Sequence, residues 1–195
     1  DAVEAAENIL KVTVVPNGKA NTNTYILYDD DGVTVGLSVF ADRGAILDPG
    51  TDDYKLLRAI EDCRANISSI LLTHGHKNHS ASVMEILRNF GSIPIYVAEA
   101  EKPLLDKALT SGQVLGDEVP VLVASHVIDL HYVKDQETID VAGHKVGLRI
   151  GAHVQGTVIA TPGHTPGSVC YRFGNFLFTG DTLLCNGVGS CDDAK

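Results

Sequence analysis

Short runs of β-branched and aromatic residues dominate the first part of the chain. They predict β-strands over residues 10–15, 23–28 and 33–40, and a further strand that ends at the Pro-Gly turn of 44–50. Residues 16–21, Pro-Asn-Gly-Lys-Ala-Asn, are mostly turn-forming and separate the first two strands. The chain is therefore expected to begin with a series of short strands.

Helical and strand-like patterns alternate in the middle of the chain. Val83, Ile86, Leu87 and Phe90 stand at i, i+3, i+4 and i+7, which indicates the apolar face of a helix. The predicted helices cover 52–64, about 80–90 and 99–109, and the predicted strands between them cover 67–72 and 93–98. Such alternation is typical of an α/β layer.

The last third of the chain returns to short strands. They are predicted over 128–133, 138–141, 146–150, 157–161, 169–173 and 176–180, with a turn at Gly174-Asn175. The sequence has no repeat with a period of 20–50 residues and no clear linker. We therefore expect a single α/β domain over residues 1–195.

Composition and charge limit the classes of function. The chain of 195 residues is 44% hydrophobic and carries a formal net charge of −10, which argues against nucleic acid as a partner. It has no run of 18 apolar residues, so no membrane span is expected, and no signal-like segment, which favours the cytoplasm. A small-molecule substrate is the expected partner, and the oligomeric state is left open.

The four cysteines form neither a CxxC metal motif nor a dense disulfide pattern. They are Cys63, Cys170, Cys185 and Cys191. Reduced and mostly buried thiols are expected, although Cys185 and Cys191 could pair if the protein is secreted.

Candidate metal-binding residues gather at three places that each follow an apolar segment. His74, His76 and His79 lie in the sequence THGHKNH, and residues i and i+2 of an extended segment point to the same side. His164 lies in TPGHTPG, where two prolines and two glycines restrict the loop, and Asp181 follows the strand in FTGDTLL. Imidazoles and a carboxylate that converge on one point are typical of a zinc or iron site.

The other four histidines lack a partner motif. We expect each of them to be a surface residue or to be satisfied locally. They are His126, His131, His144 and His153.

Taken together and in this order, the motifs resemble those of the metallo-β-lactamase fold superfamily, and within it the glyoxalase II-like branch. The matching segments are NTYIL, AILDPG, LLTHGHKNH, TIDVAG, ATPGHTPGSVCY and FLFTGDTLL. The resemblance implies an αββα sandwich with a metal site where these loops meet at the sheet edge.

By this resemblance, individual residues take the positions of the family's metal ligands. His74, His76 and His164 match the ligands of the first metal, His79 matches a ligand of the second, and Asp181 matches the carboxylate that bridges two metals or completes one site. Asp48, in LDPG, matches a residue that often orients a ligand histidine.

The chain departs from the family pattern at two places. Asn78 stands where the family has an aspartate that binds the second metal and holds the nucleophilic water, and an amide is a weaker ligand and a poor proton acceptor. The chain also stops before the family's final histidine, and its tail carries Ser190 and Cys191 where the branch commonly has Arg and Thr. We therefore expect a domain that is incomplete at its C-terminal end: a fragment, a natural single-metal variant or a degenerate relative.

The resemblance implies a metallo-hydrolase similar to hydroxyacylglutathione hydrolases. One or two zinc ions would activate a bound water to attack a thioester or related carbonyl, with Asp181 and Asn78 as the candidate catalytic residues. One alternative is an iron-dependent persulfide dioxygenase that uses His74, His164 and Asp181. Another is a non-catalytic member of the fold.

Overall fold

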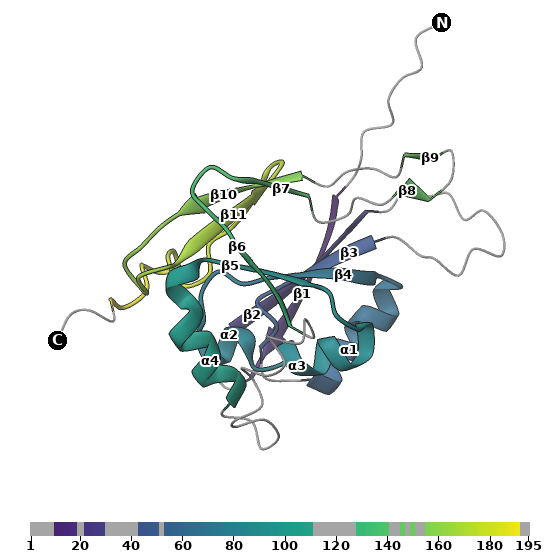
Figure 1. Cartoon of the computed structure of the whole chain (residues 1–195), viewed down its shortest axis with the longest axis horizontal. Coiled ribbons are helices and arrows are strands. Elements are labelled where there is room, and N and C mark those ends of the chain that lie inside the picture. Colours follow the sequence, from purple (N-terminus) through teal and green to yellow (C-terminus); the bar gives the residue numbers. More distant parts are fainter. Residues whose placement is uncertain are drawn as a thin grey trace, which may run out of the picture.

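The computed structural model describes residues 10–18, 22–29, 43–50, 53–110, 128–140, 145–146, 149–150 and 155–191. The strand expected over 33–40 lies outside these ranges. Figure 1 shows two sheets packed face to face, with the helices on the outer face of the larger sheet.

The larger sheet has six strands in chain order. They are β1 (Leu10–Asn17), β2 (Thr22–Asp29), β3 (Arg43–Leu47), β4 (Asn66–Leu71), β5 (Pro94–Val97) and β6 (Asp129–Tyr132). The first three strands pair antiparallel, and β3 to β6 pair parallel. The parallel half coincides with the alternating helices and strands of the sequence, because parallel neighbours need a crossover connection.

The helices lie on one face of this sheet (Figure 1). They are α1 (Asp53–Cys63), α2 (Lys77–Ser80), α3 (Val83–Phe90) and α4 (Lys102–Thr110), with a 3₁₀ turn η1 (Glu99–Glu101) before α4. Helix α1 contacts β1, α2 contacts β2 and α3 contacts β4. The helix expected over about 80–90 is α3, which begins at Val83, and the short helix α2 before it was not expected from the sequence.

The smaller sheet has the order β12-β11-β10-β7, all antiparallel. Its strands are β7 (Thr138–Asp140), β10 (Gln155–Ala160), β11 (Val169–Phe173) and β12 (Phe176–Phe178). The prediction of one strand over 146–150 is wrong. Instead, β8 (Lys145–Val146) and β9 (Arg149–Ile150) pair antiparallel.

Alternation along the central strands divides the apolar residues between two cores. In β3, Ile46 faces the helices, whereas Ala45 and Leu47 face the smaller sheet with Tyr171 and Phe173. The described residues therefore form three layers, helices, sheet and sheet, which matches the mixed α/β class expected from the sequence.

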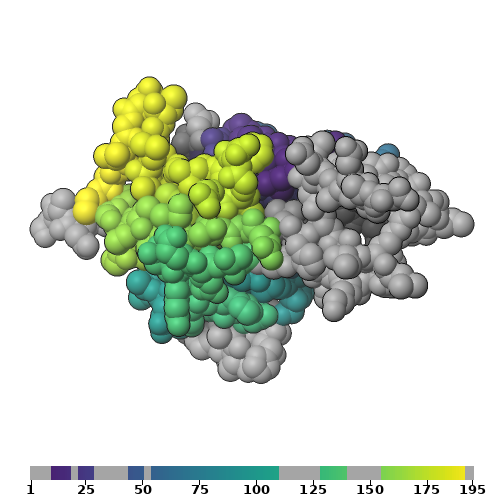
Figure 2. All heavy atoms as spheres, turned by 90° about the horizontal axis from the view of Figure 1, so that it is seen from above, coloured from purple at the N-terminus to yellow at the C-terminus, as the bar shows by residue number. Residues whose placement is uncertain are grey.

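The C-terminal segment stands out from one end of the molecule, as Figure 2 shows in yellow. The four cysteines are unpaired, but Cys185 and Cys191 in this segment are exposed, Cys63 is partly buried and Cys170 is buried, so the expectation of mostly buried thiols is wrong. Among the described helices, none is long and apolar enough to cross a membrane.

Candidate metal centre

Three loops bring the predicted metal-binding residues together. His74, His76 and His79 follow β4, His164 follows β10, and Asp181 follows β12. Two groups of residues could each hold a metal ion, because the ligand atoms within each group lie within 4.8 Å of one another. One group is His74, His76 and His164, and the other is His74, His79 and Asp181. Residues from distant parts of the sequence thus meet at one end of the two-sheet sandwich.

The nitrogen atoms have the spacing of ligands around one ion. His76 Nδ1 lies 3.0 Å from His164 Nε2, and two nitrogen ligands of a tetrahedral zinc ion are about 3.3 Å apart. Asp181 Oδ2 lies 3.4 Å from His164 Nε2 and 4.0 Å from His74 Nε2. The buried Nε2 atom of His74 has no hydrogen-bond partner among the described residues, whereas Nε2 of His79 lies 3.3 Å from Asp181 Oδ1. Because buried polar atoms are rarely left unpaired, Nε2 of His74 fits a metal ion.

Asp48 and Thr73 fix the proton of His74. Thr73 donates its backbone N–H to Asp48 Oδ1 at 2.8 Å and its hydroxyl to Asp48 Oδ2 at 2.7 Å. The hydroxyl has no second hydrogen, so the 3.0 Å contact between Thr73 Oγ1 and His74 Nδ1 requires the hydrogen to be on Nδ1. The lone pair of His74 is then on Nε2, which faces the candidate metal position.

The electrostatics of His74 favour the neutral form that a ligand needs. Burial, followed by repulsion from His79, lowers the pKa of His74 to about 3. At neutral pH this imidazole is therefore uncharged and can donate its Nε2 lone pair.

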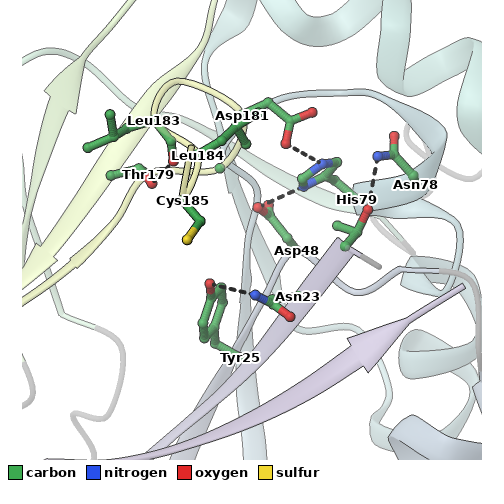
Figure 3. Close-up of a pocket in the computed structure, with 12 residues that line it drawn as sticks. Asn23, Tyr25, Asp48, Asn78, His79, Thr179, Asp181, Leu183, Leu184 and Cys185 are labelled. Carbon is green, nitrogen blue, oxygen red and sulfur yellow. Dashed lines mark hydrogen bonds and ion pairs between the residues drawn. The ribbon is translucent and has the colours of Figure 1, made fainter. Parts of the chain in front are cut away.

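His79 lies between two carboxylates, as Figure 3 shows. Its Nδ1 donates to Asp48 Oδ2 at 3.0 Å, and its Nε2 lies 3.3 Å from Asp181 Oδ1. Burial lowers the pKa of His79, but Asp48 and Asp181 outweigh it and raise the pKa to about 9. The contact with His79 in turn lowers the pKa of Asp181 to about 2. Without a cation, the positive charge of protonated His79 thus offsets part of the negative charge of Asp48 and Asp181.

His164 is oriented by the C-terminal segment. Its Nδ1 lies 2.6 Å from the carbonyl oxygen of Ser190, and since a carbonyl only accepts, the hydrogen is on Nδ1 and the lone pair is on Nε2. Gly189 N donates to Asp181 O at 2.9 Å, which ties the same segment to the residue that carries the carboxylate. Ser190 acts here through its backbone carbonyl, so this contact does not depend on the side chain at that position.

Asn78 lies at the pocket that borders the centre (Figure 3). Its Nδ2 donates to Thr22 Oγ1 at 3.0 Å, and its side chain is half-buried. The pocket has a volume of about 360 Å³. Its lining residues are Thr22, Asn23, Tyr25, Asp48, Asn78, His79, Thr179, Gly180, Asp181, Leu183, Leu184 and Cys185.

Of the other histidines, only His131 lies within the described ranges. It is exposed on β6, where its ring packs on Tyr96 and its Nε2 is 3.9 Å from Asp129 Oδ1, so it is a surface residue as expected. His126, His144 and His153 lie outside the described residues.

Two residues at the centre have no signal in the sequence motifs. Thr73 transmits the position of Asp48 to His74, and Glu101 is fully buried and accepts hydrogen bonds from both histidine loops. Thr73 is the first residue of the THGHKNH segment, but its residue type alone does not indicate this role. Glu101 lies well beyond that motif, in an ordinary helical pattern.

Comparison with known proteins agrees with this geometry. Residues 21–193 match the family model of the metallo-beta-lactamase superfamily. The fold is similar to that of BLEG-1, a B3 metallo-beta-lactamase, at 28% identity and a TM-score of 0.65, over 93% of this chain and 77% of that one. It is also similar to that of TTHA1623 in a di-iron-bound form, at 23% identity and a TM-score of 0.61, over 94% of this chain and 78% of that one. A third similar structure is ETHE1 from Myxococcus xanthus, at 18% identity and a TM-score of 0.56, over 92% of this chain and 60% of that one. The chain therefore belongs to the metallo-beta-lactamase superfamily.

Proposed function

We propose that this protein binds one transition-metal ion, with zinc the expected metal, and hydrolyses a thioester or a related carbonyl compound. The observation that carries this proposal is the convergence of His74, His76 and His164, whose ligand atoms lie within 4.8 Å of one another beside a carboxylate that borders a pocket. The glyoxalase II-like motifs of the sequence support a thioester as the substrate class, and a small molecule fits the size of the pocket.

His74, His76 and His164 are the proposed ligands. A dication held there supplies Lewis acidity, because it lowers the pKa of a water molecule and polarises a carbonyl. Three histidines leave a fourth position open, as catalytic zinc sites require. The hydrogens fixed on Nδ1 of His74 and His164 keep both Nε2 lone pairs available.

Asp181 is the proposed catalytic base. It is ionised at neutral pH, is partly exposed at the pocket and lies beside the three histidines. Asn78 borders the same pocket, but an amide is not basic enough to accept a proton. We therefore assign proton transfer to Asp181 and a neutral, polar contact to Asn78.

The shared use of His74 supports one tightly bound ion. Both ligand groups include this residue, and its Nδ1 is occupied by Thr73. One lone pair serves one ion, so a second ion would have only His79 and Asp181 as ionic or imidazole ligands. Asn78 adds a neutral amide where the family places a carboxylate, which weakens a second site further.

An iron-dependent dioxygenase is the second candidate. Asp181 Oδ2 faces Nε2 of both His74 and His164, which is the two-histidine, one-carboxylate set that non-haem iron prefers. TTHA1623, which is similar in fold, was solved in a di-iron-bound form. Metal identity after purification separates this candidate from the zinc hydrolase.

A hydrolase assay tests the proposal. The zinc-loaded protein should release thiol from S-acyl glutathione, and the Asp181→Asn variant should lose most of this activity. Asp62→Asn is the matched control, because it removes the same charge from an exposed position of α1. If the protein holds one zinc ion and releases no thiol from any acyl thioester in a panel of chain lengths, the proposed reaction is wrong. Oxygen consumption by the iron-loaded protein with a persulfide would favour the second candidate.

A further inference from the structure

Glu101 is a carboxylate buried at the base of the metal centre. Its side chain is 0% exposed. None of the ion pairs among the described residues includes it, and burial of a carboxylate without a charged partner is strongly unfavourable. Packing alone therefore does not explain why a glutamate occupies this buried position.

Each oxygen of Glu101 binds a different histidine loop. Oε2 accepts the N–H of Gly75 at 2.7 Å, and Oε1 accepts the N–H of Gly167 at 2.7 Å. Both distances are short for N–H···O bonds, as expected when the acceptor is charged. Gly75 stands between His74 and His76, and Gly167 is three residues after His164, so one carboxylate joins the two loops.

Both loops approach Glu101 as closely as a backbone can. A Cβ on Gly167 would lie 2.7 Å from Glu101 Oε1, and a Cβ on Gly75 would lie 2.8 Å from Leu104 Cβ and 2.9 Å from Leu105 N. A side chain at position 75 would meet the start of α4, and one at position 167 would meet the Glu101 carboxylate itself, so glycine at both positions lets the two loops lie against this region. The glycines and the carboxylate therefore form one unit.

We propose that Glu101 is a positioning residue that sets the separation of the two histidine loops, and with it the spacing of His76 and His164. The contacts of Asp48 and Thr73 hold His74 and His79 and do not involve Glu101. Loss of the carboxylate should therefore weaken the group of His74, His76 and His164 more than the group of His74, His79 and Asp181. The inference rests on the proposed binding of a metal by these histidines.

Glu101→Gln tests the role of the carboxylate most directly. Glutamine has the same shape, but its carbonyl oxygen accepts one of the two glycine N–H groups and its amide NH₂ faces the other, donor against donor. Glu99→Gln is the matched control, because Glu99 lies in the same 3₁₀ turn and is exposed.

The experiment is a cobalt(II) titration of the full chain after removal of metal, with a competing chelator. We expect Glu101→Gln to raise the Kd of the first ion about 10–100-fold, as is typical for residues that orient metal ligands, and to alter the cobalt visible spectrum. Glu99→Gln should match the parent in both. An unchanged Kd in Glu101→Gln, or an equal loss in Glu99→Gln, overturns the inference.

Amide hydrogen exchange of the parent chain gives a second test that needs no variant. In the metal-free protein, the amides of Gly75 and Gly167 should be protected, although both lie in loops. Rapid exchange at either glycine overturns the role of Glu101, even if Glu101→Gln fails to fold. If the parent chain binds no cobalt, the proposed function fails, while the exchange data still decide whether Glu101 joins the two loops.

Discussion

Asp48→Asn should disable the metal centre without touching a metal ligand. Asp48 is 1% exposed and its backbone has a φ of 52°, a left-handed conformation that asparagine adopts readily. Asparagine is also nearly the same size. The substitution therefore changes the hydrogen bonds of the side chain while it preserves the shape.

The consequences follow from which groups donate. Asp48 accepts three hydrogens, from Thr73 N, Thr73 Oγ1 and His79 Nδ1. In the variant, the NH₂ group cannot face the backbone N–H of Thr73, because both are donors and the backbone N–H cannot rotate. The amide oxygen of the new side chain therefore keeps the contact with Thr73 N. The NH₂ group then faces the Thr73 hydroxyl, which rotates and donates to His74 Nδ1 instead. His74 must then carry its hydrogen on Nε2, where the lone pair for the metal is needed.

The expected loss is about 10–100-fold in metal affinity, the usual range for a residue that orients ligands, or about 1.4–2.7 kcal/mol. Cobalt or zinc titration against a competing chelator measures it, and ¹H–¹⁵N NMR of the imidazoles reports the tautomer of His74. Asp62→Asn, which removes an exposed charge on α1, is the control and should bind like the parent. A folded Asp48→Asn variant with parental affinity would refute the reasoning, as would a parent protein whose His74 carries its hydrogen on Nε2.

Three further perturbations probe other parts of the centre. His164→Ala should abolish metal retention and keep the secondary structure measured by circular dichroism; parental retention would remove this residue from the ligand set. Asn78→Asp fits the site, because the Thr22 hydroxyl can donate to the new carboxylate. It should raise the affinity for a second metal ion and raise the rate of thioester turnover by up to about 10²–10⁴-fold. If neither quantity changes in calorimetry and kinetics, Asn78 does not border the metal. In the metal-free protein, kept so by a chelator, protonated His79 adds about 3 kcal/mol to the free energy of unfolding, because its pKa is raised to about 9 in the folded state. This contribution is complete below about pH 6.5 and should be lost as the pH rises through about 9. Urea unfolding measures this loss, which should be absent in His79→Gln, and greater stability at pH 9 than at pH 6.5 would contradict it.

The local motifs of the sequence were sufficient to predict the residues that meet at the centre. His74, His76, His79, His164 and Asp181 each follow an apolar strand, and strands that end at one edge of a sandwich deliver their loops to the same place. The superfamily and the α/β class followed from the same motifs, and the family model confirms the superfamily. The glyoxalase II-like branch, the metal and the reaction stay predictions.

The contacts that orient these residues could not be predicted in the same way. Glu101 meets Gly75 and Gly167 from 26 and 66 positions away, and the carbonyl of Ser190 binds His164 through an atom that every residue possesses. Neither contact leaves a local pattern, because it depends on how the loops pack in three dimensions. The antiparallel pairing of β8 with β9 was missed for a different reason, since the sequence of residues 146–150 was interpreted as one continuous strand.

Metal content is the most direct test of the central claim, that His74, His76 and His164 hold a single ion. The chain should be purified without chelator, exchanged into metal-free buffer and analysed by inductively coupled plasma mass spectrometry. We predict one transition-metal ion per chain, with zinc the dominant element, and loss of that ion in His76→Ala. Two tightly bound ions per chain, or one ion that persists in His76→Ala, would contradict the claim.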